Sequence, residues 1–132
     1  MEHSAGFLKL VNDAKQHVKE EDHHATKRRI DARDKFVLID TREDSEWARG
    51  HLPGAIHMCR GHIERDIEKT VPEKDALIVL YCGGGFRSAL AAESLQKMGY
   101  TNVISMDGGW RAWTESNYPV IRDQTPARNQ KS

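Results

Sequence analysis

Residues 76–88 read ALIVLYCGGGFRS and join a short apolar run to a glycine-rich turn. The first six residues are apolar or aromatic, which is typical of a strand buried on both faces of a parallel sheet. Three glycines follow Cys82, and a stretch with helical spacing begins at Phe86. This order places Cys82 at the carboxyl end of a strand, where open α/β sheets bind their ligands.

The same short apolar pattern occurs elsewhere in the chain, separated by stretches with helical spacing. Three further strands are predicted at residues 36–40, 55–57 and 102–105, and another is predicted to begin at 18–20. Asp22 has the residue type that caps a helix, which would run toward Ile30. Further helices are expected at 43–49, 61–70, 86–98 and 109–116. The alternation predicts an α/β domain with a mainly parallel sheet.

Both ends of the chain lie outside this alternation. Ser4 can cap an N-terminal helix whose apolar residues share one face: Phe7, Leu8, Val11, Ala14 and Val18. We expect this face to pack on the domain itself, in a position too early in the chain to contribute to the Cys82 loop. The predicted division is an N-terminal helical extension (1–17), one domain (18–121) and a polar C-terminal tail (122–132).

The composition argues against several classes of protein. Lys plus Arg and Asp plus Glu both number 20, so the basic excess typical of a nucleic-acid partner is missing. The longest strongly apolar run, residues 76–82, is too short for a bilayer, and the N-terminus lacks the pattern of a secretory signal. We therefore expect no membrane partner and a cytoplasmic location. Two cysteines are too few for a disulfide scaffold, so both are expected as free thiols.

The Cys82 loop combines three features that stabilise an anion. Its glycines let successive backbone N–H groups turn toward the sulfur. The helix that begins at Phe86 contributes the positive end of its dipole, and Arg87 contributes a fixed charge. Together they favour a thiolate at Cys82. A buried structural cysteine needs neither three consecutive glycines nor an arginine, so the sequence predicts a nucleophile held in an anion-binding loop.

Three motifs resemble those of the rhodanese-like family and occur in the family's order. The run from Cys82 to Ser88 is similar to its active-site loop, cysteine-x-x-glycine-x-arginine-serine. Upstream, Asp40-Thr41-Arg42, Glu46 and GHLPGAI at 50–56 resemble its second motif. GGWRAW at 108–113 resembles its closing glycine-glycine-x-x-x-tryptophan motif. The resemblance covers residues 18–120, most of the chain.

This resemblance implies a fold and a reaction. The fold is a five-stranded parallel sheet with helices on both faces. The reaction is that of a single-domain sulfurtransferase, in which Cys82 takes a sulfane sulfur from a donor such as thiosulfate and passes it to cyanide, a thiol or a protein. The chemistry proceeds through a Cys82 persulfide without a cofactor. The residues expected to bind the substrate in the loop are Gly83, Gly84, Gly85, Phe86, Arg87 and Ser88.

Three upstream residues are expected to support the site. Asp40 and Arg42 follow a predicted strand at the same sheet edge as Cys82, and we interpret them as an ion pair that shapes the floor of the site. His51 could be read as a catalytic base. The resemblance instead implies that it holds a turn, because nothing in the spacing places it against Cys82.

The segment after the short strand at 55–57 carries further candidates. Arg60 is either a ligand of an anionic donor or a solvated arginine. Cys59 is interpreted as a packed thiol, with a second reactive cysteine as the alternative. Together with His57 and His62, Cys59 has loose metal-ligand spacing, but no tight cysteine pair accompanies them and no metal is expected.

Other functions remain alternatives. A persulfide carrier or a non-catalytic regulatory module would use the same fold, although Cys82, the glycines and Arg87 favour chemistry. Cysteine phosphatases have five residues between cysteine and arginine, whereas four separate Cys82 from Arg87 here. Arsenate reduction is a further minor alternative. The expected partners are a small anionic sulfur donor and a protein that donates or accepts sulfur; the oligomeric state stays open.

Overall fold

One parallel sheet of five strands organises the chain. The computed structural model describes residues 2–122, so all of the predicted tail except Arg122 lies outside the described residues. The strands lie in the order β1-β5-β4-β2-β3. The parallel sheet confirms the predicted fold class. Their bounds are Lys19–Asp22 (β1), Val37–Asp40 (β2), Ile56–His57 (β3), Ile78–Tyr81 (β4) and Val103–Asp107 (β5).

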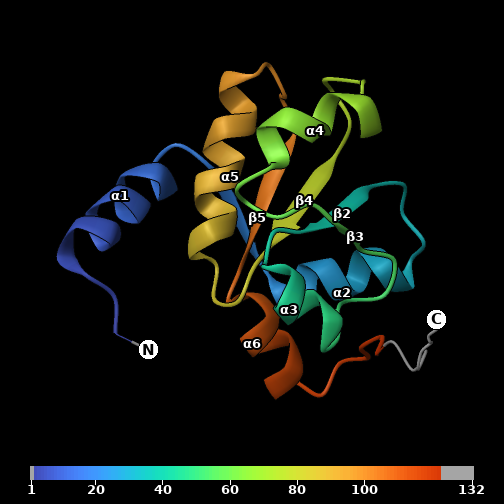
Figure 1. The fold of residues 1–132 in the computed structure, drawn as a ribbon. Helices are drawn as coiled ribbons and strands as arrows, with labels where there is room; N and C mark the ends of the chain where they lie inside the picture. Colours follow the sequence, from blue (N-terminus) through green and yellow to red (C-terminus); the bar gives the residue numbers. More distant parts are fainter. Residues whose placement is uncertain (1, 123–132) are drawn as a thin grey trace, which may run out of the picture.

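Helices cover both faces of this sheet, as Figure 1 shows. Helices α4 and α5 pack against one face, while α2 and α6 cover the other. None of the helices among residues 2–122 is long and apolar enough to cross a membrane. The helix bounds are Ala5–Lys15 (α1), His23–Asp31 (α2), Asp44–Ala48 (α3), Ile63–Thr70 (α4), Phe86–Lys97 (α5) and Gly109–Glu115 (α6).

The central strand β4 joins two hydrophobic cores. Successive strand side chains point to opposite faces. Accordingly, Ile78 and Leu80 enter the core beneath α4 and α5, and Val79 and Tyr81 enter the core beneath α2 and α6. All four side chains are buried. This double burial is why the run at 76–81 lacks alternation in the sequence.

Helix α1 lies outside α5 and packs against it (Figure 1). Ser4 caps the helix by accepting a hydrogen bond from the Phe7 amide (3.3 Å), and Val11 and Ala14 are buried. The prediction that α1 packs on its own domain is confirmed. The expectation that it makes no contribution to the Cys82 loop is wrong, because Phe86, the first residue of α5, packs against the aromatic residues at the start of the α1 segment.

Candidate active site

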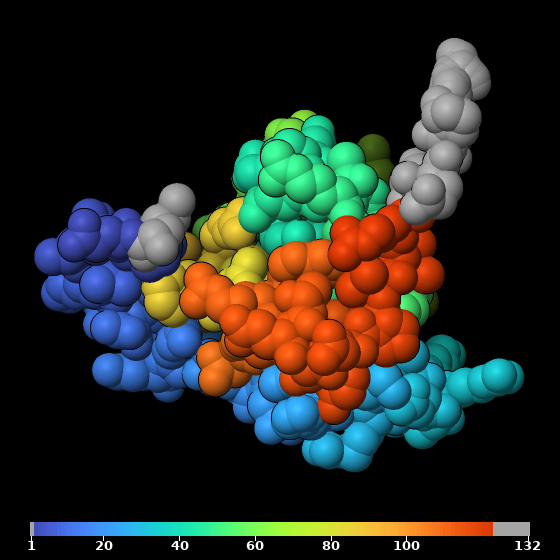
Figure 2. All heavy atoms as spheres, turned by 90° about the horizontal axis from the view of Figure 1, so that it is seen from below, coloured from blue at the N-terminus to red at the C-terminus, as the bar shows by residue number. Residues whose placement is uncertain are grey.

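Cys82 follows β4 directly at the carboxyl edge of the sheet and is only 1% exposed. Figure 2 shows this edge of the molecule. Yellow atoms of the segment around residues 82–87 lie between the blue N-terminal helix, the teal residues near α3 and the orange residues of α6. The segment that begins α5 therefore lies where parts of the chain distant in sequence come together.

The turn after Cys82 directs two backbone donors at its sulfur. The Gly85 amide donates to Cys82 Sγ at 3.1 Å, and the Ser88 amide donates at 3.4 Å. Gly85 adopts a φ of +100°, and a Cβ there would lie 3.3 Å from the Gly108 nitrogen. Both the backbone conformation and the close approach therefore require glycine at this position. The predicted inward turn of the loop N–H groups is present.

Further amides of the loop are free to bind an anion. Among residues 2–122, no acceptor pairs with the backbone N–H groups of Gly84, Phe86 or Arg87. Phe86 and Arg87 form the first turn of α5, where the helix dipole also favours negative charge. These three amides are therefore candidate donors for an anion bound at the loop.

Backbone hydrogen bonds from α6 fix the position of the Cys82 loop. The Trp110 amide donates to the Cys82 carbonyl at 2.7 Å, and the Arg111 amide donates to the Gly83 carbonyl at 3.0 Å. Gly109 makes this approach possible, since it adopts a φ of +56° and a Cβ there would clash with the Cys82 carbonyl oxygen. Because both carbonyls are turned toward α6, the planar trans peptides direct the N–H groups of Gly83 and Gly84 away from that helix.

Arg87 is positioned by a residue to which the sequence assigned no role. Its guanidinium donates to both carboxylate oxygens of Glu46, at 2.7 and 3.1 Å. Glu46 is itself fixed by accepting a hydrogen bond from the Glu43 amide at the start of α3. The hydrogen bond from Arg87 lowers the pKa of the Glu46 carboxyl below its ordinary value. The sequence predicted neither contact, because glutamate is not a usual N-cap residue and Arg87 lies 41 residues from Glu46.

We expect Glu46→Gln to destabilise the fold in a pH-dependent way. The loss should be about 1 kcal/mol at pH 7, because the ion pair is partly solvent-screened. A carboxyl whose folded pKa is depressed contributes stability above its unfolded pKa of about 4.3 and loses that contribution as it is protonated. The difference in unfolding free energy from wild type should therefore shrink between pH 7 and pH 3 in urea titrations.

The matched control for this experiment is Glu115→Gln, because Glu115 is exposed and forms no ion pair with residues 2–122. It should change stability little at either pH. A Glu46→Gln deficit that is equally large at pH 7 and pH 3 would show that the carboxylate charge is not what stabilises this contact.

Asp40 and Arg42 form a buried ion pair at the end of β2 (2.8 Å). The Asp40 carboxylate also accepts a hydrogen bond from the Tyr81 hydroxyl at 2.6 Å, and Arg42 donates to the Gly50 carbonyl at 2.7 Å. Burial and the neighbouring Asp40 raise the pKa of Tyr81, which keeps its hydroxyl protonated as a donor. The network links β2, β4 and the turn at Gly50, and the supporting role of both residues stays a prediction.

The contacts of His51 lie outside the Cys82 loop. Its ring stacks on Trp47 with centroids 3.7 Å apart, and its Nδ1 is 3.0 Å from the Leu52 carbonyl oxygen. Its backbone pairs with Ile121. None of these contacts involves Cys82, so the structure offers no geometry for a base at this position.

Arg60 and Cys59 lie on the segment that follows β3. The Arg60 amide donates to the Thr41 carbonyl (3.0 Å) and its guanidinium pairs with Glu64 (2.8 Å). Its Nε is buried without a partner among the described residues. Cys59 Sγ is 3.5 Å from Nδ1 of His62. The structure places this segment two strands away from Cys82, because β2 and β3 succeed β4 in the sheet.

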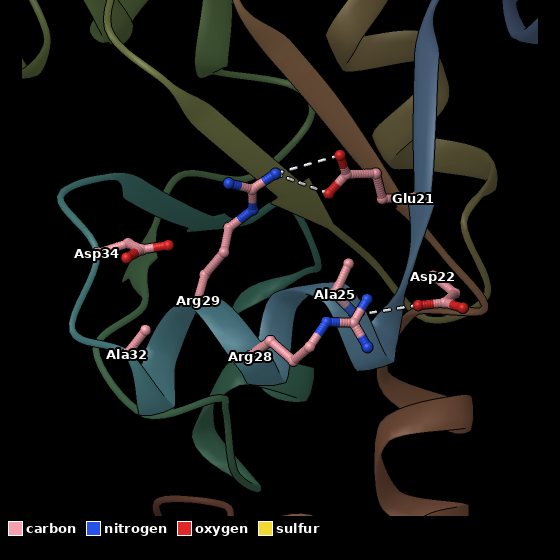
Figure 3. Close-up of a pocket in the computed structure, with 7 residues that line it drawn as sticks. All are labelled: Glu21, Asp22, Ala25, Arg28, Arg29, Ala32 and Asp34. Atoms are coloured by element: carbon pink, nitrogen blue, oxygen red, sulfur yellow. Dashed lines mark hydrogen bonds and ion pairs between the residues drawn. The ribbon is translucent and has the colours of Figure 1, made fainter.

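A separate hollow of about 580 Å³ opens beside β1 and α2 (Figure 3). Within it, Arg29 donates to both carboxylate oxygens of Glu21, at 2.9 and 3.1 Å. None of the residues that line it belongs to the Cys82 loop, so this hollow is not the candidate site. The lining residues are Glu21, Asp22, Ala25, Arg28, Arg29, Ala32 and Asp34.

Comparison with known proteins identifies the family. The family model described as Rhodanese-like domain matches residues 21–116. The chain belongs to the rhodanese-like domain family. This membership confirms the family predicted from the three motifs, and the rhodanese-like domain covers the whole sheet apart from the first residues of β1.

Two curated relatives of this rhodanese-like chain come from Bacillus subtilis (strain 168). One, named "Putative sulfurtransferase YtwF", is 35% identical over 102 residues, which are 77% of this chain and 96% of that protein. The other, named "Putative sulfur carrier protein YrkF", is 32% identical over 90 residues, 68% of this chain. The alignment spans only 48% of YrkF. The chain is thus related to sulfurtransferases and sulfur carriers.

A solved structure from Rhodopseudomonas palustris CGA009 has the same fold. It superimposes with a TM-score of 0.80 at 28% identity and covers 92% of this chain and 98% of that chain. That protein is described as of unknown function and as a possible tyrosine phosphatase. Proteins of one fold can carry out different reactions, so the rhodanese-like fold alone does not determine which anion the cysteine loop binds. The geometry and length of the loop decide this.

Proposed function

We propose that this chain is a sulfurtransferase in which Cys82 carries the transferred sulfur as a persulfide. The Cys82 thiolate attacks the sulfane sulfur of thiosulfate, the S–S bond of the donor breaks, and sulfite leaves with the electron pair. An acceptor nucleophile then attacks the terminal sulfur, and Cys82 leaves as a thiolate. One sulfur atom is transferred in two displacement steps.

The observation that carries this proposal is the arrangement of amides around Cys82 Sγ. Gly85 and Ser88 already donate to the sulfur, and the amides of Gly84, Phe86 and Arg87 have no acceptor among the described residues. These three would hold the terminal sulfur of the persulfide. Because the donors are fixed by the turn and by α6, little reorganisation is needed as negative charge moves onto that sulfur.

Arg87 and Arg60 would attract the anionic donor. Arg87 folds over the loop and lies 3.0 Å from the position of a Cβ on Gly83, so its charge is close to the site although Glu46 partly offsets it. Arg60 is proposed as a more distant ligand, on the strength of its unpartnered Nε. Asp40, Arg42 and His51 would act only by supporting the sheet edge.

The relatives support this function and leave room for a carrier role. A sulfurtransferase and a sulfur carrier are both similar to this chain, so we propose that the acceptor is a thiol or a protein, with cyanide as a laboratory substitute. A cytoplasmic setting, in which both thiols stay reduced, suits this cycle.

A cysteine phosphatase is the second candidate, favoured by the description of the Rhodopseudomonas structure. Against it stands the short loop, which has four residues between Cys82 and Arg87. The loop closes on the sulfur itself, with amide nitrogens 3.1 and 3.4 Å away. This arrangement suits one added sulfur atom better than a tetrahedral oxyanion.

The test is to incubate the wild-type chain with thiosulfate and to measure its intact mass and that of the Cys82 peptide. We expect a gain of one sulfur atom on Cys82, which cyanide removes as thiocyanate, and negligible hydrolysis of aryl phosphates. Efficient phosphate hydrolysis without persulfide formation would overturn the assignment in favour of a phosphatase.

A further inference from the structure

Aromatic side chains from the N-terminal segment surround the first residue of α5. The ring centroids of His3 and Phe86 are 4.9 Å apart, and those of Phe7 and Phe86 are 6.1 Å apart. His3 and Phe7 also contact each other, with centroids 5.3 Å apart. All three pairs are tilted, and their centroid distances lie in the range in which aromatic side chains attract one another. A segment distant in sequence thus packs directly on the Cys82 loop.

The other end of α1 reaches the same loop by a second route. Lys15 Nζ lies 5.1 Å from the centroid of the Phe86 ring and 3.8 Å from Asp107 Oδ1. Asp107 borders Gly85, since its Oδ1 is 3.5 Å from the position of a Cβ there. The Gly85 amide is one of the two that donate to Cys82 Sγ. Helix α1 therefore flanks the loop on the side of Gly85 and Phe86.

The surface formed here is aromatic, and its charges are largely balanced. Lys15 is shared between Asp107 and Glu20 (3.5 Å), and Arg87 is paired with Glu46. His3 is exposed, and Phe7 and Phe86 are half-buried, so their rings present apolar area beside the loop. Inorganic thiosulfate carries no group that could use this area, whereas an organic sulfur donor does.

We propose that His3, Phe7 and Phe86 form an aromatic wall that binds the apolar organic group of a thiosulfonate donor, which makes α1 a specificity element of the Cys82 site. This inference rests on the proposed function. The Cys82 thiolate attacks the terminal sulfur of the thiosulfonate, the S–S bond breaks, and the organic sulfinate leaves with the electron pair. The persulfide formed is the same as with thiosulfate, so only recognition of the donor differs.

The test compares benzenethiosulfonate with thiosulfate as donors for the full-length wild type and for Phe7→Ala. We expect the variant to lower kcat/KM for benzenethiosulfonate by about 3- to 10-fold, the loss typical of one aromatic contact. The value for thiosulfate should stay within about twofold. The control is Leu10→Ala, which removes an apolar side chain of α1 that is 56% exposed and should leave the ratio of the two values unchanged.

The possible outcomes distinguish a failure of the aromatic wall as a specificity element from a failure of the proposed sulfur transfer. An unchanged ratio in Phe7→Ala, or an equal loss with both donors, would overturn the wall as a specificity element. Binding of benzenesulfonate, a non-reactive analogue, is followed in parallel by the amide NMR shifts of residues 85–88. Shifts in the wild type that weaken in Phe7→Ala support the wall even where no sulfur is transferred, and that combination would refute only the proposed function.

Discussion

Cys82→Ser is expected to abolish sulfur transfer and to leave the fold intact. A serine hydroxyl at this position cannot carry a persulfide, so turnover should fall by about a thousandfold or more. The fold should survive because serine differs from cysteine by one atom and its oxygen can accept the hydrogen bond from the Gly85 amide that Sγ now accepts. Thiocyanate formation from thiosulfate and cyanide measures the first effect, and thermal unfolding measures the second.

Cys59→Ser provides the matched control, since it makes the same change at the other thiol. Cys59 is half-buried beside His62, on the segment after β3, and its thiol forms no hydrogen bond with the Cys82 loop among the described residues. This variant should keep most of its activity. Sulfur transfer that persists in Cys82→Ser and disappears in Cys59→Ser would show that Cys59, and not Cys82, is the nucleophile.

Gly109→Ala should lower sulfur transfer by displacing the Cys82 loop from α6, although Cys82 itself is unchanged. The added Cβ would clash with the Cys82 carbonyl oxygen and lie 2.8 Å from the Gly83 carbonyl carbon, at a φ of +56°. Backbone strain and overpacking together should cost about 2–4 kcal/mol of unfolding free energy. The hydrogen bonds from Trp110 and Arg111 to the loop would be displaced. Sulfur transfer per folded molecule should therefore fall by about tenfold or more, because the loop amides lose their orientation toward the sulfur.

The control for this change is Gly61→Ala, because a Cβ on Gly61 has nothing within 4 Å. Urea unfolding and sulfur transfer of both variants, measured where both are folded, separate loss of stability from loss of site geometry. If Gly109→Ala were destabilised but fully active per folded molecule, α6 would support the fold without orienting the loop.

The residues around Cys82 show how much of the candidate site can be predicted from the local sequence pattern. A doubly buried strand, three glycines and a helix start are each written in consecutive residues, and they suffice to place a thiol at a sheet edge beneath inward-facing amides. Sequence periodicity and cap residues likewise predicted the strands and helices, whose ends differ from the observed ones by at most three residues. The buried Asp40–Arg42 pair was also within reach, because its members are two residues apart.

Contacts between distant segments were not accessible in this way. Glu46 and Arg87 are 41 residues apart, and nothing near either residue indicates that α3 brings the carboxylate to the guanidinium. The GGWRAW run at 108–113 was recognisable as a motif, but its Trp110 and Arg111 amides reach the carbonyls of Cys82 and Gly83 only because β5 lies beside β4 in the sheet.

Helix α1 was predicted in part from the sequence, while its position was decided only by the tertiary structure. Its amphipathic spacing and its Ser4 cap determined from the sequence alone that a helix forms there and that one face is buried. The sequence contained no sign of which surface receives that face. Only the tertiary structure placed α1 along α5, and since Phe86 begins α5, the same packing brought His3 and Phe7 to the Cys82 loop. Local spacing determines which elements form, whereas the crossing of helices over the sheet decides which of their ends meet.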